Sequence, residues 1–161
     1  MPADTTEAEA VGFAPDEIDQ NAPTRAARLK WVVVVDESLP GGRAVNAAVC
    51  VAAATSDAVG GLLGAAAVDA DGSAHPGLPW AGCTVLAADA ATLRAVRDKA
   101  VASPGTYVAD MPAAAQHTRV YAEYLQAVGA AAGGTLDYCA VSVVGPRNRV
   151  DRLVKRLPLL P

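Results

Sequence analysis

One stretch near the start of the sequence constrains the fold more than any other. It runs over Lys30–Asp36 and has the sequence KWVVVVD. Four consecutive valines predict a strand buried on both faces, because β-branched side chains fit a pleated surface that is covered from both sides. Pro40 and the glycines after it end the strand, and an alanine-rich run then predicts a helix over residues 42–56. A strand that ends in a carboxylate and turns into a helix N-terminus is typical of a ligand-binding edge.

The length of 161 residues suffices for one domain with its own core. Apolar residues make up 52% of the chain but aromatic residues only 4%, so we expect a core of Ala, Val and Leu. No apolar run approaches the roughly 20 residues of a membrane span, and the N-terminus does not resemble a signal peptide. The three cysteines lack the spacing of a metal site. We expect reduced, buried thiols in a cytoplasmic protein, at Cys50, Cys83 and Cys139.

Charge divides the chain into two parts. Residues 1–29 hold six of the 17 acidic residues and only two of the 13 basic residues. We expect residues 1–29 to form a disordered or loosely docked acidic tail, with Phe13 and Ile18 as its docking side chains, and residues 30–161 to form the domain. The domain is neutral, which disfavours tRNA as a partner, because nonspecific binding of nucleic acid depends on neutralising phosphates.

Short apolar strands alternate with helices along the rest of the chain. Asp89 is the expected N-cap of a helix that ends near Ala102, and Pro112 is expected at the first position of another helix that ends near Val128. A last short helix is expected over residues 147–157. Further strands are predicted over residues 65–69, 83–88, 106–109 and 136–144. This order predicts an α/β fold, a single-domain three-layer sandwich with a small mixed β-sheet.

Several segments together resemble a bacterial family called domain of unknown function 2000. They are KWVVVVD at 30–36 with the helix start at 46–48, HPGLPW at 75–80, QHT at 116–118, and VVGPR at 143–147 with the leucine-rich end of the chain. The resemblance covers residues 30–161. It implies a fold similar to that of type 2 peptidyl-tRNA hydrolases, which share the opening strand, glycine turn and helix and the closing Gly-Pro segment.

The catalytic positions of those hydrolases are partly kept. Their Gly-Lys-Gly-Lys turn corresponds to Gly42-Arg43-Ala44-Val45, which keeps one cation of two. Val49 and Ala52 stand where the enzymes have a glutamine and a histidine. The resemblance gives Asp110 and Thr118 the places of the aspartate and threonine in the second catalytic stretch of the enzymes.

Three polar residues that follow the first strand are candidate site residues. Asp36 is a candidate general base, since partial burial raises the pKa of a carboxyl group, and a turn cap or a pair with Arg43 is the alternative. Arg43 is a candidate for binding an anion at the helix N-terminus. Asn46, one turn further, is a candidate for binding a ligand carbonyl. Ordinary surface placement is the alternative for both.

The two histidines lie far apart in the sequence. Neither has the spacing of a two-histidine metal site, so the sequence predicts neither a metal nor another cofactor. His75 and Trp80 are candidate pocket-lining residues, and a hydrogen bond that stabilises the loop is the alternative for His75. His117 is a candidate base oriented by Asp110.

The segment after His117 supplies two further candidates. Thr118 is a candidate hydrogen-bond donor to a ligand. Tyr121 is a candidate ligand contact, and a core or dimer contact is its alternative.

These residues support three hypotheses of function. The first is a small-molecule site formed by residues 41–46, 75–80 and 110–118, with hydrolysis or proton transfer on an acyl or amide-type ligand. The second is an RNA-ester hydrolase or tRNA-binding domain that uses Arg43 and the bases of residues 147–156; complementing the helix dipole is the alternative for those bases. The third is a non-catalytic dimeric binding protein, because apolar helix faces on a small domain favour a homodimer.

Overall fold

The valine run forms β1 (Leu29–Asp36), an inner strand of a four-stranded sheet with the order β4-β1-β6-β5. The structure is a computed structural model, and it describes residues 10–161. β4 (Thr84–Ala88) pairs with β1 in parallel, whereas β6 (Tyr138–Pro146) pairs antiparallel with both β1 and β5 (Tyr107–Pro112). The predicted mixed sheet is therefore confirmed.

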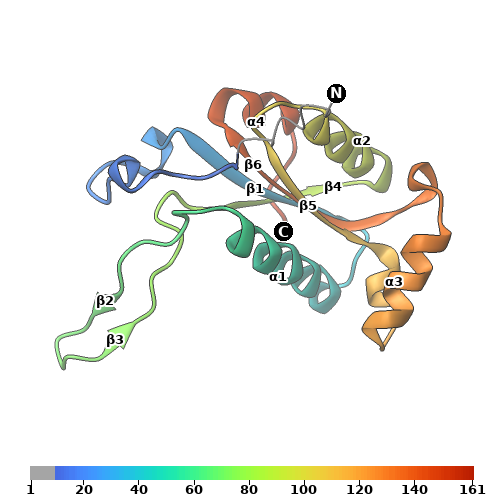
Figure 1. Ribbon diagram of the computed structural model, residues 1–161, viewed down its shortest axis with the longest axis horizontal. Helices are drawn as coiled ribbons and strands as arrows, with labels where there is room; N and C mark the ends of the chain where they lie inside the picture. Colours follow the sequence, from blue (N-terminus) through green and yellow to red (C-terminus); the bar gives the residue numbers. More distant parts are fainter. Residues whose placement is uncertain (1–9) are drawn as a thin grey trace, which may run out of the picture.

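Helices cover both faces of this sheet (Figure 1). α1 (Gly41–Ala58) packs on one face, and α2 (Ala90–Val101) and α4 (Arg147–Leu153) pack on the other. Successive side chains of β1 point to opposite faces, so Val33 and Val35 join the core under α1 while Val32 and Val34 join the core under α2 and α4. Burial of each valine contributes about 1.5–3 kcal/mol, which explains why both helical layers are required.

A chain of buried hydrogen bonds fixes α1 on the sheet. The indole Nε1–H of Trp31 in β1 donates to Ser142 Oγ in β6 over 2.8 Å, and Ser142 Oγ lies 2.7 Å from Thr55 Oγ1 in α1. The Thr55 hydroxyl donates its single proton to the carbonyl oxygen of Val51, so the Ser142 hydroxyl must be the donor to Thr55. Ser142 and Thr55 are fully buried. Each proton donated in this row of hydrogen bonds therefore has one defined acceptor.

The helix expected from Pro112 to Val128 is wrong. β5 continues to Pro112, which has extended backbone angles, and a short 3₁₀ turn, η3 (Ala113–Gln116), follows. The Thr118 hydroxyl donates to the carbonyl oxygen of Ala114, a local bond that competes with helix propagation. Val120 is extended, and the helix starts again as α3 (Tyr121–Ala130). In the described part of the chain, α3 has no buried residue.

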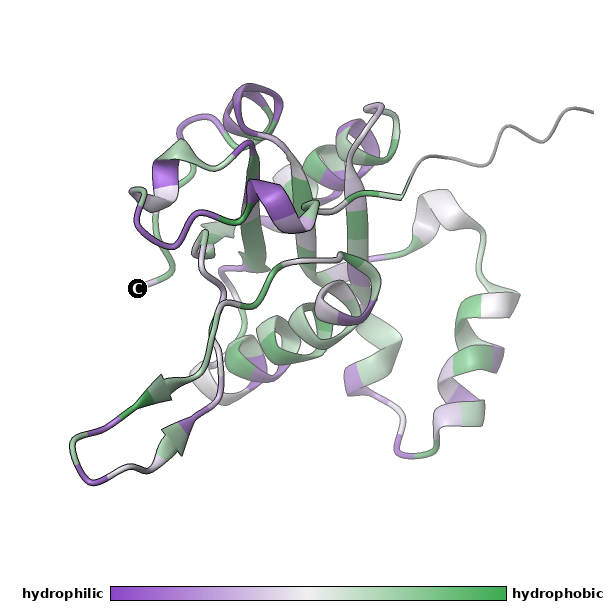
Figure 2. Ribbon diagram, turned by 60° about the vertical axis from the view of Figure 1, so that its left-hand side comes forward, coloured by the Kyte–Doolittle hydropathy of each residue, from purple (hydrophilic) through white to green (hydrophobic). Residues whose placement is uncertain are grey.

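The strand predicted over residues 65–69 does not join the main sheet. It is shortened to β2 (Ala67–Val68), which pairs with β3 (Ala74–His75) in a two-stranded hairpin. The Asp69 carboxylate accepts hydrogen bonds from two backbone N–H groups in the turn, and Gly72 has a φ of +89° there. The hairpin projects away from the sheet, on the side of α1 opposite to α3 (Figures 1 and 2).

Residues 10–28 pack against the domain. Phe13 is buried, and its ring centroid lies 4.8 Å from that of Trp80. Two short 3₁₀ turns follow, η1 (Pro15–Glu17) and η2 (Thr24–Ala26), and Glu17 pairs with Arg28. Phe13 is thus one of the two docking side chains expected in the acidic tail, and Ile18 contacts the same core. The remainder of that tail, residues 1–9, lies outside the described residues.

The C-terminal segment covers one edge of the sheet. The final helix ends at Leu153, earlier than expected, and the chain then runs along β4. The backbone N–H of Ala87 donates to Pro158 O, and the N–H of Leu160 donates to Val85 O. These bonds satisfy backbone groups of β4 that would otherwise be unpaired at the edge.

Removing the central hydroxyl of the buried chain tests its role in the fold. We expect Ser142→Ala to lower the free energy of unfolding by about 1–3 kcal/mol, because the Trp31 indole N–H would be buried without an acceptor. Urea unfolding followed by circular dichroism measures this change. Thr55→Val is the matched control, and the double variant should cost less than the sum of the single variants, because the residues share one network. Strict additivity would contradict this account.

Candidate functional site

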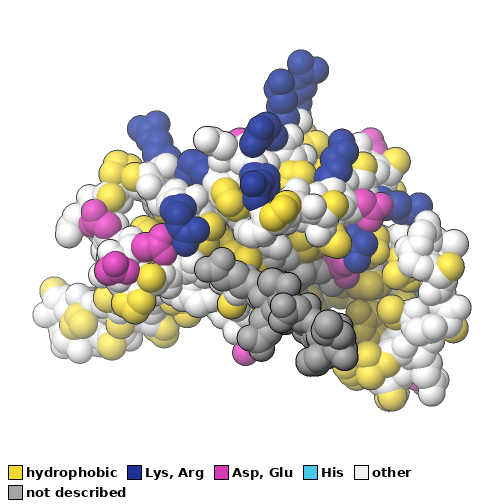
Figure 3. All heavy atoms as spheres, turned by 45° about the horizontal axis from the view of Figure 1, so that its top comes forward, with side chains coloured by type: hydrophobic (Ala, Val, Ile, Leu, Met, Phe, Trp, Pro, Cys, Tyr) yellow, Lys and Arg dark blue, Asp and Glu magenta, His cyan; other side chains and the backbone are white. Residues whose placement is uncertain are grey.

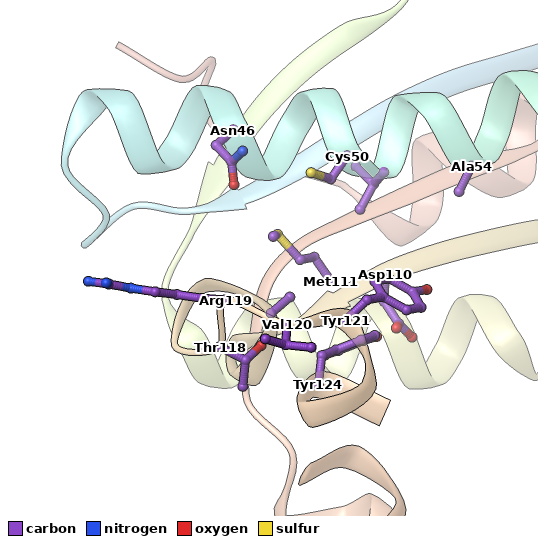
Figure 4. Close-up of a pocket in the computed structure, with 12 residues that line it drawn as sticks. Asn46, Cys50, Ala54, Asp110, Met111, Thr118, Arg119, Val120, Tyr121 and Tyr124 are labelled. Carbon is purple, nitrogen blue, oxygen red and sulfur yellow. The ribbon is translucent and has the colours of Figure 1, made fainter. Parts of the chain in front are cut away.

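A cavity of about 500 Å³ lies between α1 and the segment that runs from the end of β5 to the start of α3 (Figure 4). α1 forms one wall, the end of β5 forms the floor, and η3, the loop after it and the first turn of α3 form the other wall. The lining residues are Asn46, Cys50, Val51, Ala54, Asp110, Met111, Ala115, Thr118, Arg119, Val120, Tyr121 and Tyr124. We call this space the α1–α3 cavity.

Four of the nine candidate site residues line the α1–α3 cavity. They are Asn46, Asp110, Thr118 and Tyr121. The other five lie outside it, and they are Asp36, Arg43, His75, Trp80 and His117. The structure therefore brings α1 and the segment 110–121 together at one cavity, and the 75–80 loop lies away from both.

Asp36 and Arg43 have local roles near the start of α1. Asp36 Oδ1 accepts hydrogen bonds from the backbone N–H and the hydroxyl of Ser38, at 2.9 and 2.8 Å, so this carboxylate caps the turn after β1. The backbone carbonyl of Arg43 accepts a hydrogen bond of 2.9 Å from Gln116 Nε2. The Arg43 guanidinium is exposed and forms no hydrogen bond or ion pair with any residue of the described range 10–161.

His117 is exposed at the end of η3 and does not line the cavity. The expected continuous helix would have placed it one turn before Tyr121. Because the helix is interrupted at residues 117–120, the imidazole and the tyrosine no longer share a helix face. Asp110 pairs with Arg97, whose Nε lies 3.0 Å from Asp110 Oδ2, and it does not orient His117.

His75 and Trp80 border a separate hollow of about 360 Å³ at the base of the β2–β3 hairpin. His75 Nε2 lies 3.2 Å from Asp69 Oδ2. The hydrogen bond from the backbone N–H of Ser73 is the main cause that lowers the pKa of Asp69, and the hydrogen bond with His75 is the second. The indole of Trp80 donates to the carbonyl oxygen of Gly61 over 2.7 Å. Both side chains therefore stabilise the loop in which they lie.

One end of the α1–α3 cavity is rich in hydroxyl groups. The rings of Tyr121 and Tyr124 are 5.4 Å apart and tilted. Burial raises the pKa of Tyr124, and the nearby Tyr121 and Asp110 raise it further. Burial also raises the pKa of Tyr107, whose phenol donates to the carbonyl oxygen of Ala54 on α1. Tyr107 and Tyr124 are therefore protonated at neutral pH, and the Tyr124 hydroxyl can donate a hydrogen bond.

The middle of the cavity is apolar, and its other end carries an amide and a cation. Met111 and Val51 form buried surfaces in the middle. Asn46 and Cys50 lie on the side of α1 that faces this space (Figure 4). Arg119 extends away from the tyrosines, toward the end nearer to Asn46 (Figure 4). Sequence reasoning missed Arg119, although it directly follows Thr118 and is the only Lys or Arg between Lys99 and Arg147.

The expectation that Cys50 and Cys83 are buried is wrong, whereas Cys139 is buried as expected. Cys50 is exposed because it lies on the flank of α1, between the buried side that carries Ala47 and Val51 and the outer side. Its neighbours in sequence are apolar, and this is why the sequence alone suggested a core position.

The described residues contain neither a cluster of metal ligands nor a membrane-spanning helix. Within residues 10–161, no three His, Cys, Asp or Glu side chains gather in a way that could hold a metal ion. In the same residues, no helix is long and apolar enough to cross a membrane.

Comparisons with known proteins give a family and a fold. A family model described as "Protein of unknown function (DUF2000)" matches residues 29–161, which confirms the resemblance drawn from the sequence. A solved structure of the protein of unknown function Atu0240 from Agrobacterium tumefaciens strain C58 is similar, with a TM-score of 0.75 and 17% sequence identity. The similarity covers 82% of this chain and 97% of that one, and at this identity it shows a common fold. No curated protein sequence matches the chain.

The pKa values of the nearby tyrosines test the effect of the negative charge of Asp110. A negative charge disfavours a phenolate, so Asp110→Asn should lower the pKa values of Tyr107, Tyr124 and Tyr138, which the Asp110 charge raises. These values should stay above the ordinary one, because burial is the larger cause. Absorbance at alkaline pH measures the shift. Asp71→Asn, on the hairpin, is the control and should leave the titration unchanged; an equal shift in both variants would contradict the geometry.

Proposed function

Because this chain belongs to the DUF2000 family, which is described only as being of unknown function, we propose a function from its own residues. The protein binds a small organic molecule in the α1–α3 cavity. A volume of about 500 Å³ lies within the range of about 300–1,000 Å³ that is usual for small-molecule sites.

The distribution of chemical groups along the cavity is the observation that carries this proposal. Met111 and Val51 offer an apolar middle, which favours a ligand with an apolar or aromatic body. Arg119 and Asn46 at one end suit a carboxylate or another anionic group. The phenols of Tyr121 and Tyr124 at the other end can donate to an oxygen of the ligand. An elongated aromatic carboxylate fits this order of groups.

Turnover of an acyl or amide-type ligand would depend on Asp110. Among the described residues, Asp110 is the only carboxylate that lines the cavity, so it takes the role of base that the sequence assigned to Asp36 or His117. The Thr118 proton is engaged with the Ala114 carbonyl, which leaves the tyrosines as the free donors. Binding is therefore the core of the proposal, and hydrolysis or proton transfer is the chemistry that Asp110 would add.

The thiols of the protein provide a test of ligand binding. Cys50 lines the cavity and Cys83 does not, while both are exposed. We expect saturating 2-naphthoate to slow the alkylation of Cys50 by iodoacetamide at least about tenfold and to leave Cys83 unaffected. Desolvation raises the pKa of Cys83 to about 12, so the rate of each thiol with the compound is compared with its own rate without it. Mass spectrometry of the two peptides measures both rates in one sample.

Two controls complete this test. In Arg119→Ala, about ten times more 2-naphthoate should be needed for the same protection of Cys50, because the variant lacks the charge-assisted hydrogen bonds to the carboxylate. The neutral analogue 2-naphthamide should protect less well. Equal slowing of Cys50 and Cys83, or no slowing by either compound, would refute the proposed site.

Binding of tRNA is a second candidate function, favoured by the distribution of cations. Lys and Arg side chains are spread over the face that carries α2 and α4 (Figure 3). The similarity to the fold of type 2 peptidyl-tRNA hydrolases, which we propose from the sequence, points the same way. However, Arg147 donates to the carbonyl oxygens of Thr24 and Ala27, and Arg149 donates to that of Pro104. These two guanidinium groups hold separate segments together, whereas Arg152 donates to Asn148 O within its own helix. Arg152, Lys155 and Arg156 therefore remain for a phosphate backbone.

The salt dependence of binding tests this second candidate. If tRNA binds through these three cations, replacing all three by Ala should reduce the slope of log Kd against log salt by about 2–3, since each phosphate contact contributes about 0.7–0.9. Filter binding of bulk tRNA between low and physiological salt measures the slope. Absence of binding at low salt, or an unchanged slope in the triple variant, would eliminate this candidate.

A further inference from the structure

Most exposed large apolar side chains belong to elements that lie on the α1 side of the sheet (Figure 1). Apart from Val101 and Leu159, every exposed large apolar side chain in the described residues lies on α1, on the hairpin segment 63–78, or at the start of α3. These side chains are Val45, Val49, Leu63, Val68, Leu78, Val120, Tyr121 and Leu125. We call this surface the α1 face. Apolar side chains concentrated on one face mark a surface that another molecule covers.

The outer side of α1 has the pattern of a helix-packing surface. Opposite its buried side, exposed residues follow one another at spacings of four and three, and they are Gly42, Asn46, Val49, Ala53 and Ser56. This spacing places them on one stripe, as in helices that pack side by side. Their small size allows a second helix to approach closely. No charged residue occurs between Arg43 and Asp57.

The elements beside α1 make this face concave. The β2–β3 hairpin follows the C-terminal end of α1, and the tyrosines of α3 that line the α1–α3 cavity lie beside the part of α1 that carries Cys50 and Ala54 (Figure 4). Both project past α1 in the same direction (Figures 1 and 2). A ten-residue helix without buried residues and a two-stranded hairpin are each marginal on their own, which favours a partner between them.

We propose that the α1 face binds a second copy of this chain, with the two α1 helices antiparallel across a two-fold axis. Charge at the ends of α1 supports this orientation. Arg43 and Asp57 are both exposed, and neither side chain forms a hydrogen bond or ion pair within residues 10–161. They lie about 21 Å apart along the helix, at 1.5 Å per residue.

An antiparallel pair centred near residue 50 therefore places Arg43 of each copy against Asp57 of the other, whereas a parallel pair would oppose like charges. The α1 face shares Asn46, Val120 and Tyr121 with the lining of the α1–α3 cavity, whereas Arg43 and Asp57, whose charges set the orientation of the dimer, do not line it.

Charge exchange tests the orientation. The unmodified protein should sediment as a dimer at about 100 µM. Arg43→Glu and Asp57→Arg should each raise the dissociation constant of the dimer at least about tenfold, since each change creates two like-charge contacts in a two-fold dimer. The double variant should return to within about threefold of the original value. Both positions are exposed, so circular dichroism should show unchanged folding in all three variants.

Disulfide formation tests the position of the axis. In a Cys50→Ala/Cys83→Ser background, Val49→Cys should form an intermolecular disulfide under mild oxidation, because facing positions of two packed helices are close enough for one. Val101→Cys on α2 is the matched control, since Val101 and Val49 are 55% and 61% exposed, and it should stay reduced. A monomer at about 100 µM, a dimer insensitive to both charge reversals, or equal cross-linking of the two cysteine variants would overturn the proposal.

Discussion

The orientation of α1 on the sheet depends on the buried hydrogen bonds that run from Trp31 through Ser142 to Thr55. An apolar contact between a helix and a sheet tolerates rotation of the helix, because dispersion and hydrophobic burial have little directional preference. Hydroxyl and indole groups require a defined geometry, and leaving one of them unpaired costs about 1–3 kcal/mol. With Thr55 directed toward Ser142 in β6, the flank of α1 that carries Asn46 and Cys50 must border the cavity, and Val49 must face outward.

Local sequence signals suffice to predict an element where one residue or a short run dictates the backbone. The valine run gave β1, and Asp89 is the N-cap expected for α2, accepting a hydrogen bond from the N–H of Thr92. Pro112 shows the limit of such signals, because its φ suits both the first turn of a helix and the end of a strand. The ladder with β6 extends β5 as far as Pro112, and the Thr118 hydroxyl then interrupts the helix.

The candidate site was predictable in part for the same reason. Asn46 follows a helix start and Asp110 ends a strand, the resemblance adds Thr118, and Tyr121 follows in the same segment; the fold brings all four to one cavity. His117 was misplaced with the helix that was expected to carry it. The exposure of Cys50 and the role of Arg119 depend on which flank of α1 and which side of the loop face the cavity. Those relations arise from contacts between residues far apart in sequence, which no local pattern contains.

α1 thus has three functional sides: one packs on the sheet, one lines the cavity and the outer one is free for a second copy. The flank of α1 and the segment 110–124 together form the proposed ligand site. A crystal structure determined with 2-naphthoate would locate this ligand. We expect density for the naphthyl rings against Met111, with the carboxylate within hydrogen-bond distance of Arg119 or Asn46. Density elsewhere, with an empty space between α1 and α3, would contradict it.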